Sequence, residues 1–295
     1  MKHAVSAIIC TRDRAARLDR TLATLAALDL ADVPGFELIL VDNGSGDDTP
    51  AVIRRFAAVA PFPVQVVVHT QGGVCAGRNA GIARARHPVL LFTDDDCYPA
   101  HDWVQAASRL FAEELMQIVA GRVALFDPTH LPLAMKDDPA PGRLDAVSGL
   151  VGFAHGANLA VGRPVVGLVG PFDVRLGPGT AAHAGEDVDL CYRAFRAGVP
   201  VRYHPALAVR HDHRRTGQAV WYEQVKGYAE GAGAMTMKHL LAGRTDLLRM
   251  TYWDIRSALR RWRAGGETWR WPAAKLAAIA GAVRFLFFAS WRRPI

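Results

Sequence analysis

Short apolar runs alternate with helical repeats along the first hundred residues of the chain. The runs are of strand length and rich in β-branched residues, and they cover residues 4–10, 36–41, 64–68 and 89–93. The intervals between them place apolar residues at helical spacing, at Leu18, Leu22, Leu25 and Leu28 and then at Val52, Phe56 and Val59. Strands that alternate with helices predict an α/β fold with a doubly wound, mostly parallel sheet covered on both faces.

Side chains that can cap helices stand near the expected helix starts. We expect Thr11 or Asp13 to cap the first helix, and Asp48 or Thr49 to cap the second. A third helix is expected within AGEDVDLCYRAFRAG, residues 184–198, with Asp189 as its cap. The first two helices would then begin just beyond the carboxyl ends of the strands that precede them.

Polar residues follow the ends of the predicted strands. Thr11 and Arg12 follow the first strand, Asp42 follows the second, and the triplet Asp94 to Asp96 follows the fourth. Because parallel sheets bind ligands beyond the carboxyl ends of their strands, we expect these side chains to meet in one crevice. Three carboxylates after a buried strand are costly unless a cation neutralises them, and their oxygens suit Mg²⁺ or Mn²⁺. A metal there would hold phosphates, whereas the alternative is a solvated acidic turn.

The segment GGVCAGRN, residues 72–79, matches a phosphate-binding P-loop only in part. Arg78 and Asn79 stand where the lysine and the hydroxyl residue of that loop belong, and the segment follows the third strand. A P-loop nucleotide hydrolase is therefore not expected. Arg78 is expected to direct its guanidinium at a phosphate, and a purely structural glycine loop is the alternative. No GxGxxG sequence follows the first strand, which argues against nicotinamide chemistry.

Two further groups of titratable residues stand in the second half of the chain. Glu186 and Asp187 precede the third helix, where the helix dipole alone favours acidic residues. A direct displacement also needs a carboxylate base opposite the leaving group, and this pair can supply one. We expect His211 and His213 to point to opposite faces of a strand, so that only one imidazole would complete a carboxylate metal site. Surface histidines are the alternative.

Composition narrows the class of protein. The 295 residues are 51% hydrophobic and 21% charged, which suits one large domain or a medium domain with an extension. Cys10, Cys75, Cys97 and Cys191 form no CxxC pair, so neither a disulfide framework nor a structural zinc site is expected. A reducing cytoplasm fits this cysteine usage. The opening MKHAVSAIIC lacks the features of a secretion leader, so export is not expected.

The positive charge of the chain, formally +7, is mostly a C-terminal property. Beyond His213, arginines alternate with tryptophans and tyrosines in a pattern typical of amphipathic helices at a lipid interface. Residues 271–291 are long enough to span a bilayer, but Lys275 and Arg284 would each cost about 3 kcal/mol at its centre. We expect this region either to lie on a membrane or to pack on the rest of the chain or on another subunit. No nucleic-acid partner is expected, because no binding motif accompanies the charge.

Eight segments taken together resemble the family 2 glycosyltransferases, which have the fold called GT-A. The segments are SAIICTRDR, LILVDNGSGDDT, GGVCAGRNAGI, VLLFTDDDCYP, GANLAV, GPFD, GEDVDLCYRAFRAG and VRHDH. The resemblance covers about residues 4–213, and we expect a catalytic domain over 1–213 and a basic, amphipathic helical extension over 214–295. No Gln-x-x-Arg-Trp sequence follows the acidic pair, and no set of long apolar spans is present, so single addition is favoured over processive synthesis.

The resemblance implies a transferase that moves a sugar, with inversion, from a nucleotide-diphosphate sugar to an acceptor hydroxyl. Asp187 would be the catalytic base, with Glu186 as the fallback. The cofactor would be a divalent metal, Mn²⁺ or Mg²⁺, with Asp96 as its chief ligand. His211 would be the distal ligand, and His213 competes with it for that role.

For the donor, the resemblance implies one role for each polar strand end. Thr11, Arg12 and Asp42 would hold the nucleobase and ribose. Arg78 would lie near the donor phosphates, and Asp94 would contact the nucleoside. These residues would therefore make up the donor half of the site.

Asp95 and Asn158 complete the implied donor-binding set. The role of Asp95 stays open, and Asn158 belongs with Gly156 and Ala157 to a loop that would shape the donor and acceptor pocket. The acceptor would be a glycan, a lipid-linked molecule or a small molecule, in cell-surface polysaccharide or glycolipid synthesis at the cytoplasmic face of the membrane. Two alternatives stay open. One is a nucleotidyltransferase, although TRDRAAR lacks the usual glycine-rich loop, and the other is a membrane-docked sugar-nucleotide binding protein without catalysis.

Overall fold

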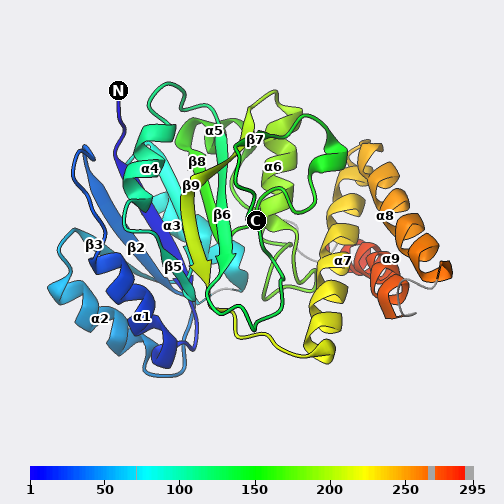
Figure 1. The fold of residues 1–295 in the computed structure, drawn as a ribbon, viewed down its shortest axis with the longest axis horizontal. Coiled ribbons are helices and arrows are strands. Elements are labelled where there is room, and N and C mark those ends of the chain that lie inside the picture. Colours follow the sequence, from blue (N-terminus) through cyan, green and yellow to red (C-terminus); the bar gives the residue numbers. More distant parts are fainter. Residues whose placement is uncertain (71, 265–269, 290–295) are drawn as a thin grey trace.

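The computed structural model describes residues 1–70, 72–264 and 270–289. Its strands are β1 (Val5–Thr11), β2 (Phe36–Asp42), β3 (Val64–Val68), β4 (Val89–Asp94), β5 (Cys97–Pro99), β6 (Ile118–Leu125), β7 (Gly142–Arg143), β8 (Asn158–Gly162) and β9 (Val201–His211). Its α-helices are α1 (Ala15–Ala26), α2 (Thr49–Val59), α3 (Gly73–Arg84), α4 (Trp103–Leu110), α5 (Arg163–Val169), α6 (Glu186–Arg196), α7 (Gln218–Leu241), α8 (Asp246–Arg263) and α9 (Arg270–Ala289). Figure 1 shows the sheet in the centre, with α7, α8 and α9 gathered at one end.

The strands form one sheet in the order β3-β2-β1-β4-β8-β6-β9-β5, and β7 pairs with β9. β1 is parallel to β2 and β4, and β2 is parallel to β3. β8 is antiparallel to β4 and β6, β9 is parallel to β6, and both β5 and β7 are antiparallel to β9. In the described part of the chain, β5, β7 and β8 therefore run against β1, β2, β3, β4, β6 and β9. The predicted doubly wound, mostly parallel sheet is confirmed, although β5, β6, β7 and β8 were not expected from the sequence.

Two apolar layers enclose the sheet. Along β1, Ile8 belongs to the cluster on one face and Ile9 to the cluster on the other, as the two-residue period of a strand requires. Residues of α1, α2 and α4 pack on the face of Ile9, whereas residues of α3, α5, α6 and α7 pack on the face of Ile8. Burial on both faces explains the continuous apolar runs. On α2 the buried face is shorter than expected, because Val59 in the last turn is 77% exposed.

One aspartate replaces the caps that the sequence led us to expect for α1 and α2. Neither helix has a side-chain cap bond from its N-cap residue, Arg14 or Asp48. Instead, Asp47 accepts hydrogen bonds from the backbone N–H groups of Ala15, at 3.1 Å, and Thr49, at 2.9 Å. The loop before α2 folds back between the two helix starts, so a single carboxylate serves both. Asp48 therefore occupies the predicted N-cap position of α2 without a side-chain cap bond, whereas the predicted caps Thr11, Asp13 and Thr49 are wrong.

The described C-terminal helices share the core of the sheet. Met235 of α7, Leu247 of α8 and Phe285 of α9 belong to the same apolar cluster as Ile8 and Phe92. Packing on the rest of the chain, one of the two expectations for this region, is therefore what the structure shows. Within the described ranges, no helix combines the length and the apolar character that crossing a bilayer requires. Residues 290 and 291 of the segment considered as a span lie outside those ranges.

Helices α7 and α9 approach each other most closely at two glycines. A Cβ on Gly233 of α7 would lie 1.8 Å from the carbonyl oxygen of Ala278, and one on Gly281 of α9 would lie 1.9 Å from that of Glu230. The two backbones therefore touch where neither helix carries a side chain, an approach that only glycine permits.

Filling one of these glycine contacts should destabilise the packing of the C-terminal helices. We expect Gly281→Ala to lower the melting temperature, because overpacking costs about 1–3 kcal/mol. Gly167→Ala is the matched control, since no atom lies within 4 Å of the place its Cβ would take in α5. Thermal unfolding followed by circular dichroism compares the two variants, and equal melting temperatures would contradict the close approach of α7 and α9.

Candidate functional site

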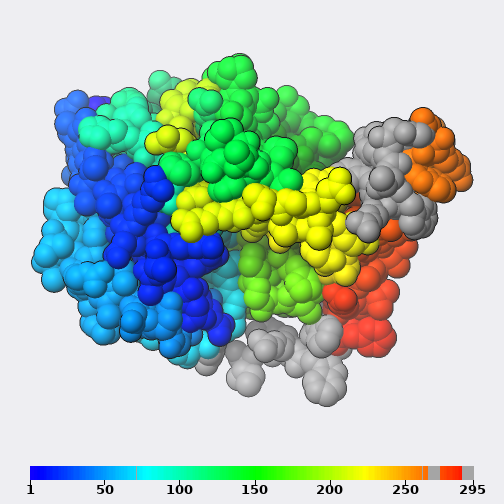
Figure 2. Space-filling view, turned by 60° about the horizontal axis from the view of Figure 1, so that its bottom comes forward, coloured from blue at the N-terminus to red at the C-terminus, as the bar shows by residue number. Residues whose placement is uncertain are grey.

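One cavity of about 1070 Å³ opens at the carboxyl ends of β1 and β4. Its wall contains most of the residues expected from the sequence, namely Thr11, Arg12, Arg78, Asp94, Asp95, Asp96, Glu186, Asp187 and His211. The opposite wall comes from α7 and α9, which the sequence did not connect with this site. Figure 2 shows the segment that carries α7 in yellow, crossing this face of the molecule between green and yellow-green parts of the chain.

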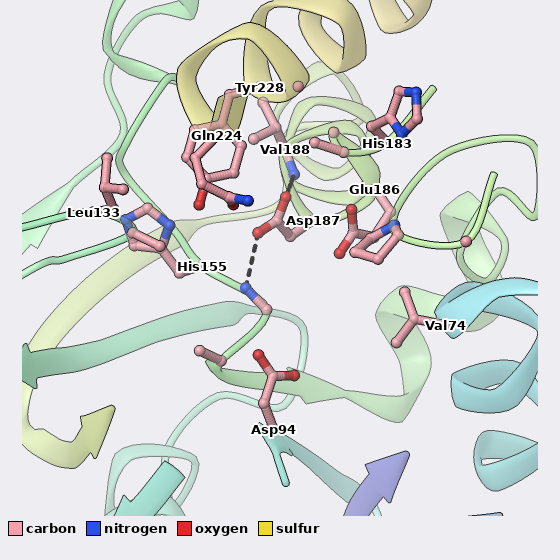
Figure 3. A pocket seen from close by; sticks show the side chains of 18 of the residues that line it. Val74, Asp94, Leu133, His155, His183, Glu186, Asp187, Val188, Gln224 and Tyr228 are labelled. Carbon is pink, nitrogen blue, oxygen red and sulfur yellow. Dashed lines mark hydrogen bonds between the residues drawn. The ribbon is translucent and has the colours of Figure 1, made fainter. Parts of the chain in front are cut away.

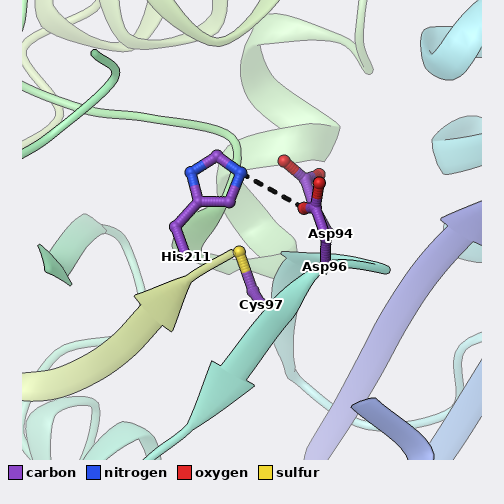
Figure 4. Close-up of side chains that lie close together, drawn as sticks. All are labelled: Asp94, Asp96, Cys97 and His211. Atoms are coloured by element: carbon purple, nitrogen blue, oxygen red, sulfur yellow. Dashed lines mark ion pairs between the residues drawn. The ribbon is translucent and has the colours of Figure 1, made fainter. Parts of the chain in front are cut away.

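Four side chains come together as a candidate metal centre. One ligand atom each from Asp94, Asp96, Cys97 and His211 lies within 4.8 Å of all the others (Figure 4). The antiparallel pairing of β5 with β9 sets Cys97 opposite His211, which explains how a residue so far along the chain reaches the aspartates. The Nε2 atom of His211 lies 3.2 Å from Oδ1 of Asp96. Carboxylate oxygens and an imidazole nitrogen are donors that suit Mn²⁺ or Mg²⁺.

The charge states around this cluster fit a cation site. Burial raises the pKa of Asp96, but the hydrogen bond and charge of His211, together with Arg14 and Arg215, bring it below its usual value. Burial also raises the pKa of the Cys97 thiol well above its usual range, so the sulfur stays protonated and is a weak ligand. Cys97 was not singled out from the sequence, although its position directly after the acidic triplet was a signal.

The contacts of His211 and His213 indicate which of them is the better candidate metal ligand. The expectation that they face opposite ways is wrong, since their rings touch edge to face at 5.1 Å between centroids, as residues two apart in an extended chain can do. His213 instead places its Nε2 atom 3.0 Å from the carbonyl oxygen of Leu131, and it is not part of the cluster. Burial lowers the pKa of His213 to about 4. His211 is therefore the better candidate ligand.

Asp95 ties the loop after β1 to the acidic triplet. Its Oδ2 atom accepts a hydrogen bond of 2.6 Å from the hydroxyl of Thr11, and its carbonyl oxygen accepts one of 2.7 Å from Thr21. The guanidinium of Arg14 lies 3.6 Å from Oδ1. Burial raises the pKa of Asp95 to about 6. Asp95 therefore links the end of β4 to the end of β1 and to α1 at the cavity.

Arg78 is an internal bridge rather than a free cation. Its Nη1 atom donates to Oε1 of Glu186 at 2.9 Å, and its Nη2 atom donates to Oδ1 of Asp94 at 3.1 Å. The side chain is 5% exposed, and a Cβ on Gly156 would lie 2.7 Å from Nη2. These two bonds use one N–H group on each terminal nitrogen, and the contact of Arg78 with a phosphate stays a prediction. Arg78 links the aspartates after β4 to the start of α6.

Glu186 and Asp187 occupy the first turn of α6 but face different surroundings. Burial, with the nearby charge of Asp187, raises the pKa of Glu186 against the opposing effect of Arg78. Asp187 accepts hydrogen bonds of 2.8 Å from the N–H groups of Gly156 and Val188, and Figure 3 shows it between α7 and the strand end that carries Asp94. Of the two, Asp187 therefore has its carboxylate at the open part of the cavity.

Two residues of the expected donor set lie outside the cavity wall. Asn158 is fully buried, and its amide donates to the carbonyl oxygens of Arg122, at 2.9 Å, and Leu207, at 2.8 Å. Its side-chain oxygen accepts from the indole of Trp103 at 3.0 Å. Asn158 as a donor-binding residue is therefore a wrong prediction, because its polar atoms are used within the fold. Asp42 is also buried, and its Oδ1 atom accepts from the N–H of Ser45 at 2.9 Å.

Asp189 is not the cap of α6 but the centre of a buried charge cluster. The helix begins at Glu186, so Asp189 lies inside its first turn. It is fully buried and contacts Arg193 at 2.8 Å, and Lys238 and His239 of α7 at 2.7 Å each. Burial raises the pKa of Asp189, but these partners outweigh it and hold the pKa at about 2. The cluster joins the helix that carries Asp187 to α7.

Removing this carboxylate charge should destabilise the protein. We expect Asp189→Asn to cost about 3–5 kcal/mol, because Arg193 loses its carboxylate partner and Lys238 keeps only Asp173, at 2.8 Å. The folded-state pKa lies below the usual 3.8, so the stabilisation is present above pH 3.8 and disappears as the pH falls toward 2. Urea unfolding at pH 7 and at pH 3 measures this. Asp145→Asn is the exposed control, and a loss no larger than its own would contradict the cluster.

A family model and two curated relatives agree with this geometry. The model described as "Glycosyl transferase family 2" matches residues 6–160. The Pre-mycofactocin glycosyltransferase of Mycobacterium tuberculosis is 28% identical over 246 residues, which is 80% of this chain and 48% of that protein. The glycosyltransferase AglE of Haloferax volcanii is 28% identical over 184 residues, 62% of this chain and 59% of that one. The chain thus spans about half the length of the curated relatives it matches.

Solved structures share the fold at low identity. The mannosyltransferase PcManGT from Pyrobaculum calidifontis, in complex with GDP-Man and Mn²⁺, has a TM-score of 0.67 and 18% identity, over 98% of this chain and 88% of that one. TarS 1-349 of S. aureus, in complex with UDP-GlcNAc, has a TM-score of 0.57 and 15% identity, over 100% and 93%. These likenesses confirm the expected fold class. The family model covers more than half of the residues and includes the acidic triplet, so the chain belongs to glycosyltransferase family 2.

Proposed function

We propose that this chain is an inverting glycosyltransferase that moves a sugar from a nucleotide-diphosphate sugar to an acceptor hydroxyl in one displacement. The observation that carries this proposal is the Asp187 carboxylate, which lines the same cavity as Asp94 and Asp96 and is oriented by the N–H of Gly156. Asp187 takes the proton of the acceptor hydroxyl while that oxygen bonds to the anomeric carbon. The bond from this carbon to the diphosphate oxygen breaks, and its electron pair leaves with the diphosphate.

The residues that would hold a divalent metal ion are Asp96 and His211, with Asp94 beside them. When bound, Mn²⁺ or Mg²⁺ neutralises the negative charge that develops on the leaving diphosphate. The carboxylate and imidazole donors fit such an ion, and the PcManGT structure with Mn²⁺ supports this part of the proposal. Arg215 lines the same cavity and favours the ionised form of Asp96, so it would add a second positive charge near the diphosphate.

The donor is proposed to lie between the ends of β1 and β4. Thr11 and Arg12 would contact the nucleoside there, and Asp94 would lie on the same side. Asp42, which stands opposite Thr11 at the end of β2, would be the remaining residue of this donor side. PcManGT was solved with GDP-Man and TarS with UDP-GlcNAc, which supports a nucleotide-diphosphate sugar as the donor class. The nucleobase and the sugar are left to experiment.

We also propose a catalytic domain at 1–213 and an extension at 214–295 that contacts the inner, cytoplasmic face of a membrane, in polysaccharide or glycolipid synthesis. The exposed face of α8 supports this contact, because Tyr252 and Trp253 are 54% and 47% exposed and Arg256 stacks on Trp253 at 5.4 Å. Aromatic and basic side chains on one helix face suit a lipid interface. No nucleic acid takes part.

Product analysis with a panel of nucleotide sugars tests the proposed function. UDP-glucose, UDP-GlcNAc and GDP-mannose are incubated with the protein and Mn²⁺ or Mg²⁺, first alone and then with acceptors. We expect release of nucleoside diphosphate, slow without acceptor, and a product whose anomeric configuration is opposite to that of the donor. Release of pyrophosphate from a nucleoside triphosphate would indicate a nucleotidyltransferase instead. Donor binding without any turnover would indicate a binding protein.

A further inference from the structure

Hydrogen-bonding side chains surround Asp187 on the side away from Asp94. Gln224 and Tyr228 stand one helical turn apart on α7 and extend toward the Asp187 carboxylate, and His155 approaches from the loop before β8 (Figure 3). All of them line the one cavity. The proposed donor residues occupy the other side, so this half of the cavity is available to the acceptor.

The imidazole of His155 contributes a hydrogen-bond acceptor to this half. Its Nε2 atom lies 3.2 Å from the carbonyl oxygen of Met135, so this nitrogen carries a proton and donates it. Burial lowers the pKa of His155 against the opposing effect of Asp187, which keeps the ring neutral. The lone pair of Nδ1 therefore remains, and it can accept a hydrogen bond from a hydroxyl group.

The cations that α7 and α9 contribute to this half are already paired with carboxylates. The pairs are Arg284 with Glu230 at 2.9 Å, Lys275 with Asp254 at 2.9 Å and Lys226 with Glu223 at 3.9 Å. His183 also lies 3.4 Å from Glu230. Arg215 is a further cation beside Tyr228, and the proposed function assigns its charge to the leaving diphosphate. The charge that α7 and α9 bring to the cavity is largely balanced, which disfavours an anionic acceptor.

We propose that this half of the cavity binds an uncharged acceptor with at least two neighbouring hydroxyl groups, that is, a sugar or polyol unit. The proposal rests on the proposed function, because it takes Asp187 as the base. One hydroxyl gives its proton to Asp187, and its neighbours bond to Gln224, Tyr228 and His155. An amide, a phenol and a neutral imidazole around one carboxylate supply directional partners for several hydroxyl groups. A lone lipid alcohol would leave these groups unpaired.

The choice of acceptor can be tested by direct binding. Saturation-transfer NMR with UDP and Mg²⁺ present uses methyl glycosides of glucose, mannose, galactose and N-acetylglucosamine as neutral probes. Phenyl phosphate is the anionic probe, and farnesol in detergent is the lipid probe. We expect saturation transfer to at least one methyl glycoside, and weaker or no transfer to the other two probes.

Substitutions in α7 then test whether Gln224 and Tyr228 bind the glycoside. We expect Gln224→Ala and Tyr228→Phe each to weaken binding of the responsive glycoside, and to raise its KM, roughly three- to tenfold, as loss of one neutral hydrogen bond implies. Gln218→Ala and Tyr252→Phe are the matched controls, because neither residue lines the cavity. Donor hydrolysis without acceptor should be unchanged in the two control variants, and circular dichroism spectra of all four variants show whether each one is folded.

The acceptor proposal and the proposed glycosyltransferase function would be overturned by different results. Preferential binding of phenyl phosphate or farnesol, or no binding of any methyl glycoside, would overturn it. Equal glycoside affinity in the α7 variants and their controls would do the same. If the chain were no glycosyltransferase, no donor would release nucleoside diphosphate even slowly, whatever the glycosides do. The two outcomes are therefore read from separate measurements.

Discussion

Asp187→Asn is expected to reduce kcat for sugar transfer by about 10²–10⁴-fold while leaving donor affinity unchanged. The range is the usual contribution of a positioned general base. The substitution keeps the shape of the side chain, and its amide oxygen can still accept the 2.8 Å hydrogen bond from the N–H of Gly156. The other oxygen, which accepts from the N–H of Val188, becomes an NH2 group that can take neither that hydrogen bond nor the proton. Initial rates with a responsive donor and acceptor, combined with donor binding by calorimetry, measure both quantities.

Glu186→Gln separates the two carboxylates of the acidic pair. Glu186 is buried and bonded to Arg78 at 2.9 Å, so its loss should lower the melting temperature more than Asp187→Asn does. Its effect on kcat should be smaller, because its carboxylate is committed to the guanidinium. Asp145→Asn, an exposed change, serves as the control for both. Normal transfer by Asp187→Asn, with loss of transfer in Glu186→Gln, would assign the base to Glu186 instead.

Asp96→Ala is expected to lower both metal affinity and turnover by at least about 100-fold. Residues that merely orient metal ligands already cost 10- to 100-fold when changed, so loss of a ligand should cost no less. The Asp96 carboxylate lies 3.2 Å from the imidazole of His211, and its lowered pKa keeps it ionised at neutral pH. Electron paramagnetic resonance of Mn²⁺ measures binding without any need for turnover.

The two neighbouring histidines provide a matched pair for the metal prediction. His211→Ala removes a member of the cluster and should weaken Mn²⁺ binding by at least about tenfold. His213→Ala removes an equally large ring whose Nε2 atom contacts the carbonyl oxygen of Leu131, so it should affect stability and leave Mn²⁺ affinity unchanged. Similar losses of affinity in both variants, or turnover that persists in EDTA, would argue against the proposed ligand set.

The donor side could be predicted from sequence because its signals are local. Thr11 and Asp94 each stand at the end of a continuous apolar run, and runs of this kind become neighbouring parallel strands. The carboxyl ends of neighbouring parallel strands lie at the same edge of the sheet. A polar residue directly after such a run can therefore be assigned to the crevice without knowledge of packing.

Side-chain partners could not be predicted, because they depend on residues far apart in the chain. Arg78 bonds to Glu186, 108 positions away, and nothing in the sequence near Arg78 indicates this partner. Asn158 was expected in the pocket because of its neighbours Gly156 and Ala157, but its amide is used by β6 and β9. In both cases the residue type indicated a hydrogen-bonding side chain, but the tertiary fold determined which partners that side chain contacts.

The half of the cavity that we propose for the acceptor could not be predicted from the sequence. Gln224 and Tyr228 lie in a helix with glycines and alanines on several sides, so no single polar face distinguishes them. They reach Asp187 only because α7 packs against α6, where Asp189 binds Lys238 and His239. Their role becomes visible only when the helices are placed on the sheet.

The separation of the two walls along the chain has a consequence for recombination. The family model ends at residue 160, whereas Gln224 and Tyr228 belong to α7, a later helix that packs into the core of the sheet through Met235. Under the proposed function, a crossover between β9 and α7 would carry Gln224 and Tyr228 into a new protein and leave His211 and the donor side with the recipient. The Gly233 and Gly281 contacts require that α7 and α9 be inherited together. The segment that carries α7, α8 and α9 would then be the unit to exchange when chimeras are built from two relatives.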